Sequence, residues 1–297
     1  MRFRDALQAH GLIPRDIIDD GKWHRCATAD KPRRKNGAYK LWVGGRRGYF
    51  MNFAEHVEAI EWRDDTPMAP RDQRAIDDRI RALRQREARE RARAIRAARE
   101  HWDTLPILTD WHAYIERKGL SIQGCKGLRL QGDDLAIPMY CGGALVNIQT
   151  ISMEGEKFYR KGCPVKGATF VMARARAVVT AFVEGFATGL AVFQSVPNST
   201  VVVCFDAGNL LAVAEDAKPR GMVVVCADND WETQRDRGFN KGVENGTKAA
   251  EIMRCGVAYP QGIRGTDWAD ARQEWGDAGP ARVRMQIMKG AKLVVSR

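Results

Sequence analysis

The residues best suited to chemistry are three acids in the second half of the chain, Glu184, Asp228 and Asp230. The Asp-x-Asp spacing suits a loop in which residues i and i+2 point the same way, so that both carboxylates can reach one ion. Carboxylate oxygens without a histidine or thiol among them are ligands for magnesium or manganese. Two such ions about 3.5–4 Å apart can hold the attacking and leaving oxygens of a phosphoryl transfer in line. These acids therefore predict a divalent-cation site for nucleotidyl transfer or phosphodiester cleavage.

The acids come directly after short, valine-rich runs that we expect to be buried strands. Apolar runs of this length are typical of a parallel sheet that is covered on both faces. Helical segments between the runs complete a strand–helix–strand alternation, and ligands of such sheets bind at the carboxyl ends of the strands. Each run leads into an acid: Ala177–Val183 into Glu184, Thr200–Phe205 into Asp206, and Met222–Ala227 into Asp228. We therefore predict an α/β catalytic domain over residues 176–297, in which Asp206 caps the next helix and is not counted as a ligand.

Further charges lie on both sides of these runs. The segment Gly265-Thr-Asp267-Trp-Ala-Asp270 is expected to place two more acids on a loop. Residues 105–175 are expected to form a basic α+β subdomain with a hairpin whose cations could hold a triphosphate. The candidates for nucleotide or template binding are Lys157, Arg160, Lys161 and Lys166. From spacing alone, an exposed charged turn is an equally good interpretation of this hairpin.

The first 65 residues are expected to form a small mixed domain that could read template DNA. The chain has a net charge of +11, and from Arg176 onward fifteen Lys and Arg nearly balance fourteen Asp and Glu, so the surplus lies in the front half. Bases of single-stranded nucleic acid stack on aromatic rings while cations follow the phosphates. The candidate DNA-binding residues are Trp23, Arg33, Arg34, Lys35, Tyr39, Lys40 and Trp42. The Asn36-Gly37 pair predicts a hairpin turn in this domain. A competing interpretation places Trp23, Trp42 and Phe50 in its core.

Residues 66–104 are expected to connect the front domain to the rest of the chain. The segment Arg71–Trp102 contains no Gly or Pro and predicts one long helix. Eleven arginines and six acids lie between Arg71 and Glu100, with only a sparse apolar stripe. Such a helix is typical of a solvated connector. Contact with a nucleic-acid backbone is the functional alternative.

The cysteine pattern and hydropathy indicate a cytoplasmic protein. Seven cysteines, an odd number without a Cys-x-x-Cys pair, predict reduced thiols and no zinc ribbon. No apolar stretch approaches the ~18 residues of a membrane span, so no membrane partner is expected. The N-terminal segment lacks the apolar core of a signal peptide.

Three successive segments resemble the motifs of a Toprim domain, in the version found in phage- and plasmid-encoded DNA primases. The segments are Val183-Glu184-Gly185-Phe186-Ala187-Thr188-Gly189-Leu190, Ala227-Asp228-Asn229-Asp230 and Gly265-Thr-Asp267-Trp-Ala-Asp270. The hairpin at Lys157–Gly162 is similar to the segment that precedes Toprim in that family. The front segment around Gly21-Lys-Trp-His-Arg-Cys26 and Asn36-Gly-Ala-Tyr-Lys40 resembles the N-terminal domain of such primases.

This resemblance implies an enzyme that starts RNA primers on single-stranded DNA, using ribonucleoside triphosphates and Mg²⁺ or Mn²⁺. It also implies a replicative helicase as a candidate partner. Many relatives carry a zinc ribbon in the front domain, but its cysteine pairs are missing here, so zinc is not expected. Bacterial replicative primases carry an Asp four residues after the Toprim glutamate, where this chain has Thr188.

The resemblance also implies roles for individual residues. Glu184 would assist metal binding or act as a general base. Asp228 and Asp230 would be the metal-binding pair, and Asp267 a further ligand, direct or through water. The cations Lys157, Arg160 and Lys161 would contact the incoming nucleotide or the template.

Two other functions are consistent with the same residues. A Toprim nuclease would use the same metal site to cut phosphodiesters, although no additional domain with a strand-attacking tyrosine is evident for a topoisomerase. A non-catalytic single-strand binder that regulates replication would use only the basic front half. Its binding would be sensitive to salt and independent of the acids.

Overall fold

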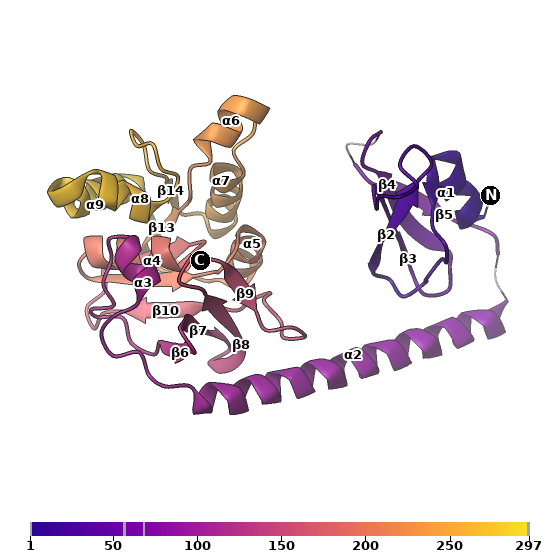
Figure 1. The fold of residues 1–297 in the computed structure, drawn as a ribbon, viewed down its shortest axis with the longest axis horizontal. Helices are drawn as coiled ribbons and strands as arrows, with labels where there is room; N and C mark the ends of the chain where they lie inside the picture. The colour runs from indigo at the N-terminus through magenta and orange to yellow at the C-terminus, as the bar shows by residue number, and fades with distance from the viewer. Residues whose placement is uncertain (1, 56–57, 68, 296–297) are drawn as a thin grey trace. The chain divides into compact units, whose positions relative to one another are not determined.

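The computed structural model describes residues 2–55, 58–67 and 69–295, which form helices and three sheets (Figure 1). The chain divides into two compact units, Met1–Arg89 and Glu90–Arg297. The long helix expected over residues 71–102 is α2 (Pro70–Thr104), and its residues are shared between the two units. Among the described residues, no helix combines the length and the apolar character that a membrane crossing requires.

The first unit is a five-stranded antiparallel sheet with one short helix, α1 (Phe3–Ala9), packed on it. Its strands pair in sequence order. They are β1 (Leu12–Ile13), β2 (Trp23–Thr28), β3 (Gly37–Leu41), β4 (Arg47–Asn52) and β5 (Ile60–Arg63). The core between helix and sheet contains Phe3, Leu7, Phe50 and Trp62.

The hairpin signal at Asn36-Gly37 was only partly right. Strands β2 and β3 do form an antiparallel pair, but Gly37 is the first residue of β3 and lies opposite Cys26. A side chain at Gly37 would lie 3.1 Å from both Leu12 Cδ2 and Thr28 Cγ2, so the glycine permits a close approach within the sheet. The next connection does turn at Gly44 and Gly45, both of which have positive φ.

The second unit begins with the C-terminal part of α2 and a four-stranded antiparallel sheet of order β6-β7-β8-β9. The elements are α3 (Ala113–Arg117), β6 (Arg129–Gln131), β7 (Asp134–Cys141), β8 (Ala144–Ile151) and β9 (Lys157–Tyr159). Helix α2 is not solvated along its whole length, because Ala98 and Trp102 are buried against Leu145 and Ile148. The helix end therefore covers part of one face of this sheet.

The larger sheet of the second unit has the order β10-β12-β11-β13-β14, with β15 also paired to β13. Its strands are β10 (Phe170–Ala173), β11 (Val179–Val183), β12 (Ser199–Val203), β13 (Gly221–Cys226), β14 (Gly256–Ala258) and β15 (Lys292–Val294). The four central strands are parallel, whereas β10 and β15 are antiparallel. The expected boundary at residue 176 therefore falls after a strand of this sheet. Alternate residues of β10 are exposed, so it lacks the continuous apolar run of a central strand.

Helices cover both faces of this sheet. They are α4 (Phe186–Ser195), α5 (Ala207–Asp216), α6 (Trp231–Arg237), α7 (Lys241–Met253), α8 (Trp268–Glu274) and α9 (Gly279–Gly290), with a 3₁₀ turn at Gly276–Ala278. Helices α4, α8 and α9 pack into one core, and α5 and α7 into the other. The first core also contains apolar residues of β7 and β8, so the smaller sheet is attached to the larger one through a shared core.

Candidate active site

Parallel pairing brings the predicted acids to one edge of the larger sheet. Val183 is level with Val203 of β12 and with Cys226 of β13, so the residues that follow these strands leave the sheet at the same edge. Glu184 and Asp228 are both partly buried there. We call the set Glu184, Asp228, Asp230 and Asp267 the acidic edge. Asp206 caps α5 as expected, because its carboxylate accepts a hydrogen bond from the Asn209 backbone N–H at 2.7 Å.

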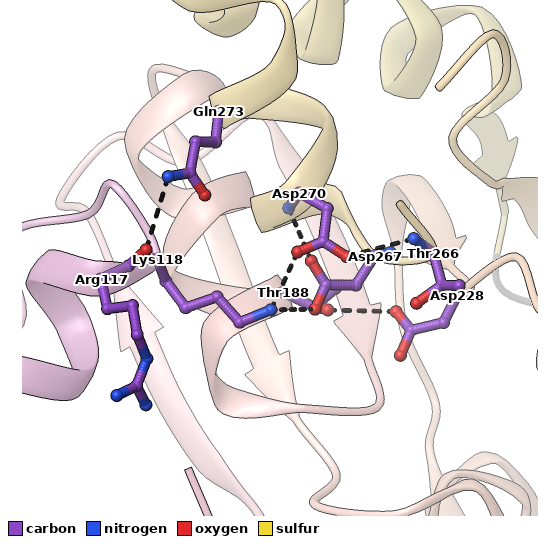
Figure 2. A network of polar contacts seen from close by, with 8 residues as sticks. All are labelled: Arg117, Lys118, Thr188, Asp228, Thr266, Asp267, Asp270 and Gln273. Carbon is purple, nitrogen blue, oxygen red and sulfur yellow. Dashed lines mark hydrogen bonds and ion pairs between the residues drawn. The ribbon is translucent and has the colours of Figure 1, made fainter. Parts of the chain in front are cut away.

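Thr188 stands where bacterial replicative primases carry an Asp, and it contacts the acidic edge directly. It lies on the first turn of α4 and is buried. Its hydroxyl donates a hydrogen bond to Asp228 Oδ1 at 3.0 Å (Figure 2). Thr188 therefore orients Asp228 without adding a negative charge.

The start of helix α7 holds the Asp228–Asp230 loop in place. The Asp230 backbone N–H donates to Asn240 Oδ1 at 3.1 Å, and the Gly242 N–H donates to Asp230 Oδ2 at 3.2 Å. Asn240 also donates to the side chain of Asn229 at 2.8 Å. One oxygen of Asp230 is therefore bonded to the helix, and the other has no hydrogen-bond partner among the described residues.

The two later acids are not on a free loop, which corrects the expectation for Asp267 and Asp270. Asp267 is the N-cap of α8 and forms a capping box with Asp270. Both carboxylates also bind Lys118 of the segment after α3, with Nζ–oxygen distances of 3.1 Å to Asp267 and 2.9 Å to Asp270 (Figure 2). Asp270 therefore caps the helix and forms the ion pair. Asp267 does both and, in addition, its charge raises the pKa of Asp228.

The acids of this edge interact electrostatically. Burial, together with the charges of Asp267 and Glu184, raises the pKa of Asp228 well above its ordinary value, and the Thr188 hydrogen bond offsets only part of this. Burial also raises the pKa of Glu184, with Lys157 opposing the effect and Asp230 adding to it. Burial lowers the pKa of Lys118, but the charges and hydrogen bonds of Asp267 and Asp270 outweigh this and hold that pKa above its usual value.

The oxygen donors of the acidic edge fit a hard divalent cation. Such a cation would relieve the repulsion that raises the pKa values of Asp228 and Glu184. Within the described ranges, no three His, Cys, Asp or Glu side chains are already arranged as a ligand set. Magnesium needs no complete protein cage, because it takes one or two carboxylates together with phosphate oxygens and water. Glu184, Asp228 and Asp230 are therefore the residues that would hold it.

The raised pKa of Asp228 leads to a prediction for stability. A carboxyl whose pKa is raised on folding binds protons more tightly in the native state, so its stability contribution falls as pH rises above its ordinary value of 3.8. We expect Asp228→Asn to remove this cost and to raise the melting temperature at pH 7–8 in EDTA, by about 2–4 °C per kcal/mol recovered. The gain should shrink toward pH 4. Calorimetry over this range checks it, with the exposed Asp216→Asn as control; an unchanged or lower melting temperature for Asp228→Asn would contradict the burial argument.

A pocket of about 260 Å³ opens beside the acidic edge. Both cations and acids line it, namely Arg117, Lys118 and Lys157 together with Asp228 and Asp267. Lys157 reaches the turn after β11, since a Cβ at Gly185 would lie 3.6 Å from its Nζ. The pocket can therefore accept an anion on its cationic side while the anion stays close to the carboxylates.

The four predicted nucleotide-binding cations do not share one site. Lys157 lines the pocket beside the acidic edge, but Arg160 lines another pocket on β8 and β9. Lys166 lines a third, with Asp206 and Asn209. Lys161 is exposed in the turn after β9. Only Lys157 lies on β9, whereas the other three lie in the turn and loop between β9 and β10, so closeness in sequence did not bring them to one site.

The candidate DNA-binding residues of the first unit include one error. Tyr39 is buried, 2% exposed, and its hydroxyl donates to the Asp16 carbonyl at 2.8 Å, so its ring cannot stack on a base. Trp23 and Trp42 are 50% and 42% exposed, so they are not core residues, and Lys40 Nζ lies 4.0 Å from the Trp42 ring centre. The basic residues Arg33, Arg34 and Lys35 line a pocket of about 460 Å³ next to Arg25.

Sequence reasoning missed the contributions of Lys118, Asn240 and Gly242. Lys118 lies 149 residues before Asp267, and its place in the site depends on packing between α3 and α8. In the sequence, Lys118 is a lysine next to a glycine, and nothing in its neighbours indicates this contact. Asn240 is the N-cap of α7, and its hydrogen bond to the Asp230 backbone depends on the tertiary fold.

A mainly parallel sheet with Glu184 after one strand and an Asp-x-Asp loop after its neighbour defines a class of protein with a Toprim-type acidic site. The comparison with family models agrees, because residues 179–278 match the Toprim domain. These residues are therefore a Toprim domain, which confirms the assignment made from the three motifs.

Similarity to characterised proteins extends beyond this domain. The chain is 31% identical over 280 residues to the DNA primase TraC of Escherichia coli, and the match covers 87% of this chain. It covers only 26% of that protein, so the chain spans about a quarter of the length of this curated relative.

Two solved bacteriophage T7 structures show weaker likeness. The primase fragment of the T7 primase-helicase has a TM-score of 0.41 and 10% identity, covering 61% of this chain and 78% of that one. A T7 lagging-strand DNA polymerase complex with primase domains bound to an RNA/DNA hybrid has a TM-score of 0.39 and 10% identity, covering 62% and 92%. Likeness at this level supports no conclusion about this chain.

Proposed function

We propose that this chain is a DNA primase that synthesises short RNA primers on single-stranded DNA by divalent-metal-dependent nucleotidyl transfer. The observation that carries the proposal is the convergence of Glu184 and Asp228 at one edge of a Toprim sheet, opposite the cations of a pocket. The identity to a DNA primase over most of this chain supports the same activity. The substrates would be ribonucleoside triphosphates and a single-stranded template, and a replicative helicase is the candidate partner.

The chain's own residues would divide the work between the two sides of the pocket. A magnesium or manganese ion bound here would polarise phosphate oxygens and stabilise the charge that develops on them. Glu184, Asp228 and Asp230 would hold it, with Thr188 fixing the orientation of Asp228. Glu184 is also the candidate for accepting a proton from the attacking hydroxyl.

The first unit would contact the template strand. Its two exposed tryptophans offer stacking surfaces, and Arg33, Arg34 and Lys35 provide cations beside a pocket in the same unit. Stacking and cation contacts together are typical of single-strand binding without strict sequence preference. Because Tyr39 is buried, we assign the stacking role to Trp23 and Trp42 alone.

The proposed activity is tested by incorporation of labelled ribonucleotides on a synthetic single-stranded template. We expect short products that require the template, all required ribonucleotides and Mg²⁺ or Mn²⁺, and that disappear with Glu184→Gln. Labelled DNA incubated with metal and no nucleotides should remain intact. Cleavage in that second reaction without synthesis in the first would instead identify a nuclease.

Lys157 offers a separate test of the cationic side of the pocket. We expect Lys157→Ala to raise the KM for ribonucleotides about tenfold or more, because hydrogen bonds to charged groups contribute roughly 1.5–3 kcal/mol. Steady-state kinetics at saturating template would measure it. Lys218→Ala, an exposed lysine before β13, is the matched control. An unchanged KM in Lys157→Ala would exclude this lysine from nucleotide binding.

A further inference from the structure

Strand β9 and the residue after it line two different pockets. Lys157 and Tyr159 face the acids: Lys157 counteracts the raised pKa of Glu184, and the Tyr159 hydroxyl donates to the Phe205 carbonyl at 3.1 Å. Phe158, Tyr159 and Arg160 line a second pocket with Gln131 and the β8 residues Ile148 and Thr150. The second pocket shares no lining residue with the pocket beside the acidic edge.

This second pocket, which we call the β9 pocket, has a volume of about 190 Å³. Its lining residue Ile148 packs in the same core as Ala98 and Trp102 of α2. Small-molecule sites usually measure about 300–1,000 Å³, so the β9 pocket suits one planar group rather than a whole nucleotide. Phe158 is 53% exposed beside it, although large aromatic rings are usually buried.

The polar groups of the β9 pocket keep hydrogen-bonding capacity that the described residues do not use. His101 of α2 lies with Nε2 2.9 Å from Gln131 Oε1, so the Gln131 oxygen accepts from the histidine and its NH₂ group remains available to donate. Thr150 is nine-tenths buried, and its hydroxyl has no hydrogen-bond partner among the described residues. Within the same ranges, the Arg160 guanidinium makes no hydrogen bond or ion pair. The pocket thus presents an exposed ring and several donors to a ligand.

We propose that the β9 pocket binds an unstacked base of a single nucleic-acid strand. Phe158 would stack on the base, Gln131 and Thr150 would hydrogen-bond acceptor atoms on its edge, and Arg160 would contact the neighbouring phosphate. The inference rests on the proposed function only in taking a single strand as the partner. It places a contact with the nucleic acid on β9, which also carries Lys157, the residue that we propose to bind the nucleotide.

Photocrosslinking tests this proposal without nucleotides or metal. Single-stranded DNA and RNA oligonucleotides containing 5-iodouracil, which has two carbonyl acceptors, would be irradiated with the full chain and the crosslinked peptide mapped by mass spectrometry. We expect a crosslink within residues 157–160 that is lost in Phe158→Ala and kept in Trp111→Ala, an exposed aromatic outside the pocket. The DNA and RNA arms distinguish a template strand from a primer strand.

Binding measurements provide the quantitative check. By fluorescence anisotropy we expect Phe158→Ala to weaken single-strand binding about tenfold, since stacking contributes ~1–3 kcal/mol per base. Gln131→Leu should weaken it about threefold. Phe158→Ala should melt like the wild type because Phe158 is 53% exposed, whereas Gln131→Leu should melt slightly lower because it loses the His101 hydrogen bond.

Three results would overturn the inference. The first is a crosslink found only outside residues 157–160, and the second is wild-type single-strand affinity in Phe158→Ala. The third is an equal loss of affinity for duplex DNA in Phe158→Ala, because the bases of a duplex are already paired. Because catalysis is not measured, a chain that makes no primers but shows the expected crosslink would contradict only the proposed function. A chain that makes primers but lacks the crosslink would contradict only the β9 pocket.

Discussion

Replacing Asp228 by Asn is expected to lower primer synthesis by more than about a hundredfold. The change removes the charge of the most deeply placed acid while preserving its shape and the hydrogen bond from Thr188. Even the loss of a residue that merely orients a metal ligand typically costs 10–100-fold, so the loss of a ligand should cost more. Initial rates of labelled ribonucleotide incorporation, at saturating metal and template, would measure the effect.

The matched control for this experiment is Asp216→Asn. Asp216 is an exposed acid at the end of α5 and has no part in the proposed site, so its substitution should leave the rate unchanged. Because Asp228→Asn is also expected to stabilise the metal-free protein, unfolding cannot explain its loss of activity. A rate for Asp228→Asn within twofold of the wild type would show that this acid does not participate.

Gly242→Ala is expected to reduce activity about a hundredfold without removing any polar side chain. A Cβ at this position would lie 2.4 Å from the Asp228 carbonyl oxygen and 2.9 Å from its carbonyl carbon, so the Asp228–Asp230 loop must move. Overpacking costs about 1–3 kcal/mol of stability, whereas a displacement of ~1 Å at an active site can cost ~10²-fold in rate. We therefore expect a large fall in kcat with a melting temperature lowered by only several degrees.

The exposed Lys248→Ala on the same helix is the control for Gly242→Ala, since it changes neither the loop nor the packing of α7. Parallel measurement of kcat and melting temperature separates loop displacement from general destabilisation. Normal kcat in Gly242→Ala would mean that the loop tolerates movement and that the position of Asp228 and Asp230 is not critical.

The central strands and their acids could be predicted because their signals are local. A strand buried on both faces needs an uninterrupted apolar run, and Val179–Val183 and Gly221–Cys226 lie within or close to the predicted ranges. Because these strands pair in parallel, the residues that come after them must lie at the same edge of the sheet. The edge strands β10 and β15 carry no such signal, because half of their residues face solvent or lie at the end of the sheet.

The errors come from features that only the tertiary fold decides. Alternation of aromatic and basic residues could not tell that Tyr39 faces the core while Trp42 faces solvent. The same limitation applied to Lys157 and Arg160, which lie three residues apart but line different pockets. Asp267 was expected on a free loop but caps α8, and its ion pair with Lys118 depends on a contact between distant segments.

Manganese binding measured by electron paramagnetic resonance tests the central claim most directly, because it reports occupancy of the acidic edge independently of turnover. We expect the wild-type chain to bind Mn²⁺, Asp228→Asn and Glu184→Gln to lose most of that binding, and Asp216→Asn to retain it. Equal Mn²⁺ affinity in all four proteins would show that Glu184 and Asp228 hold no cation and would contradict the proposed mechanism.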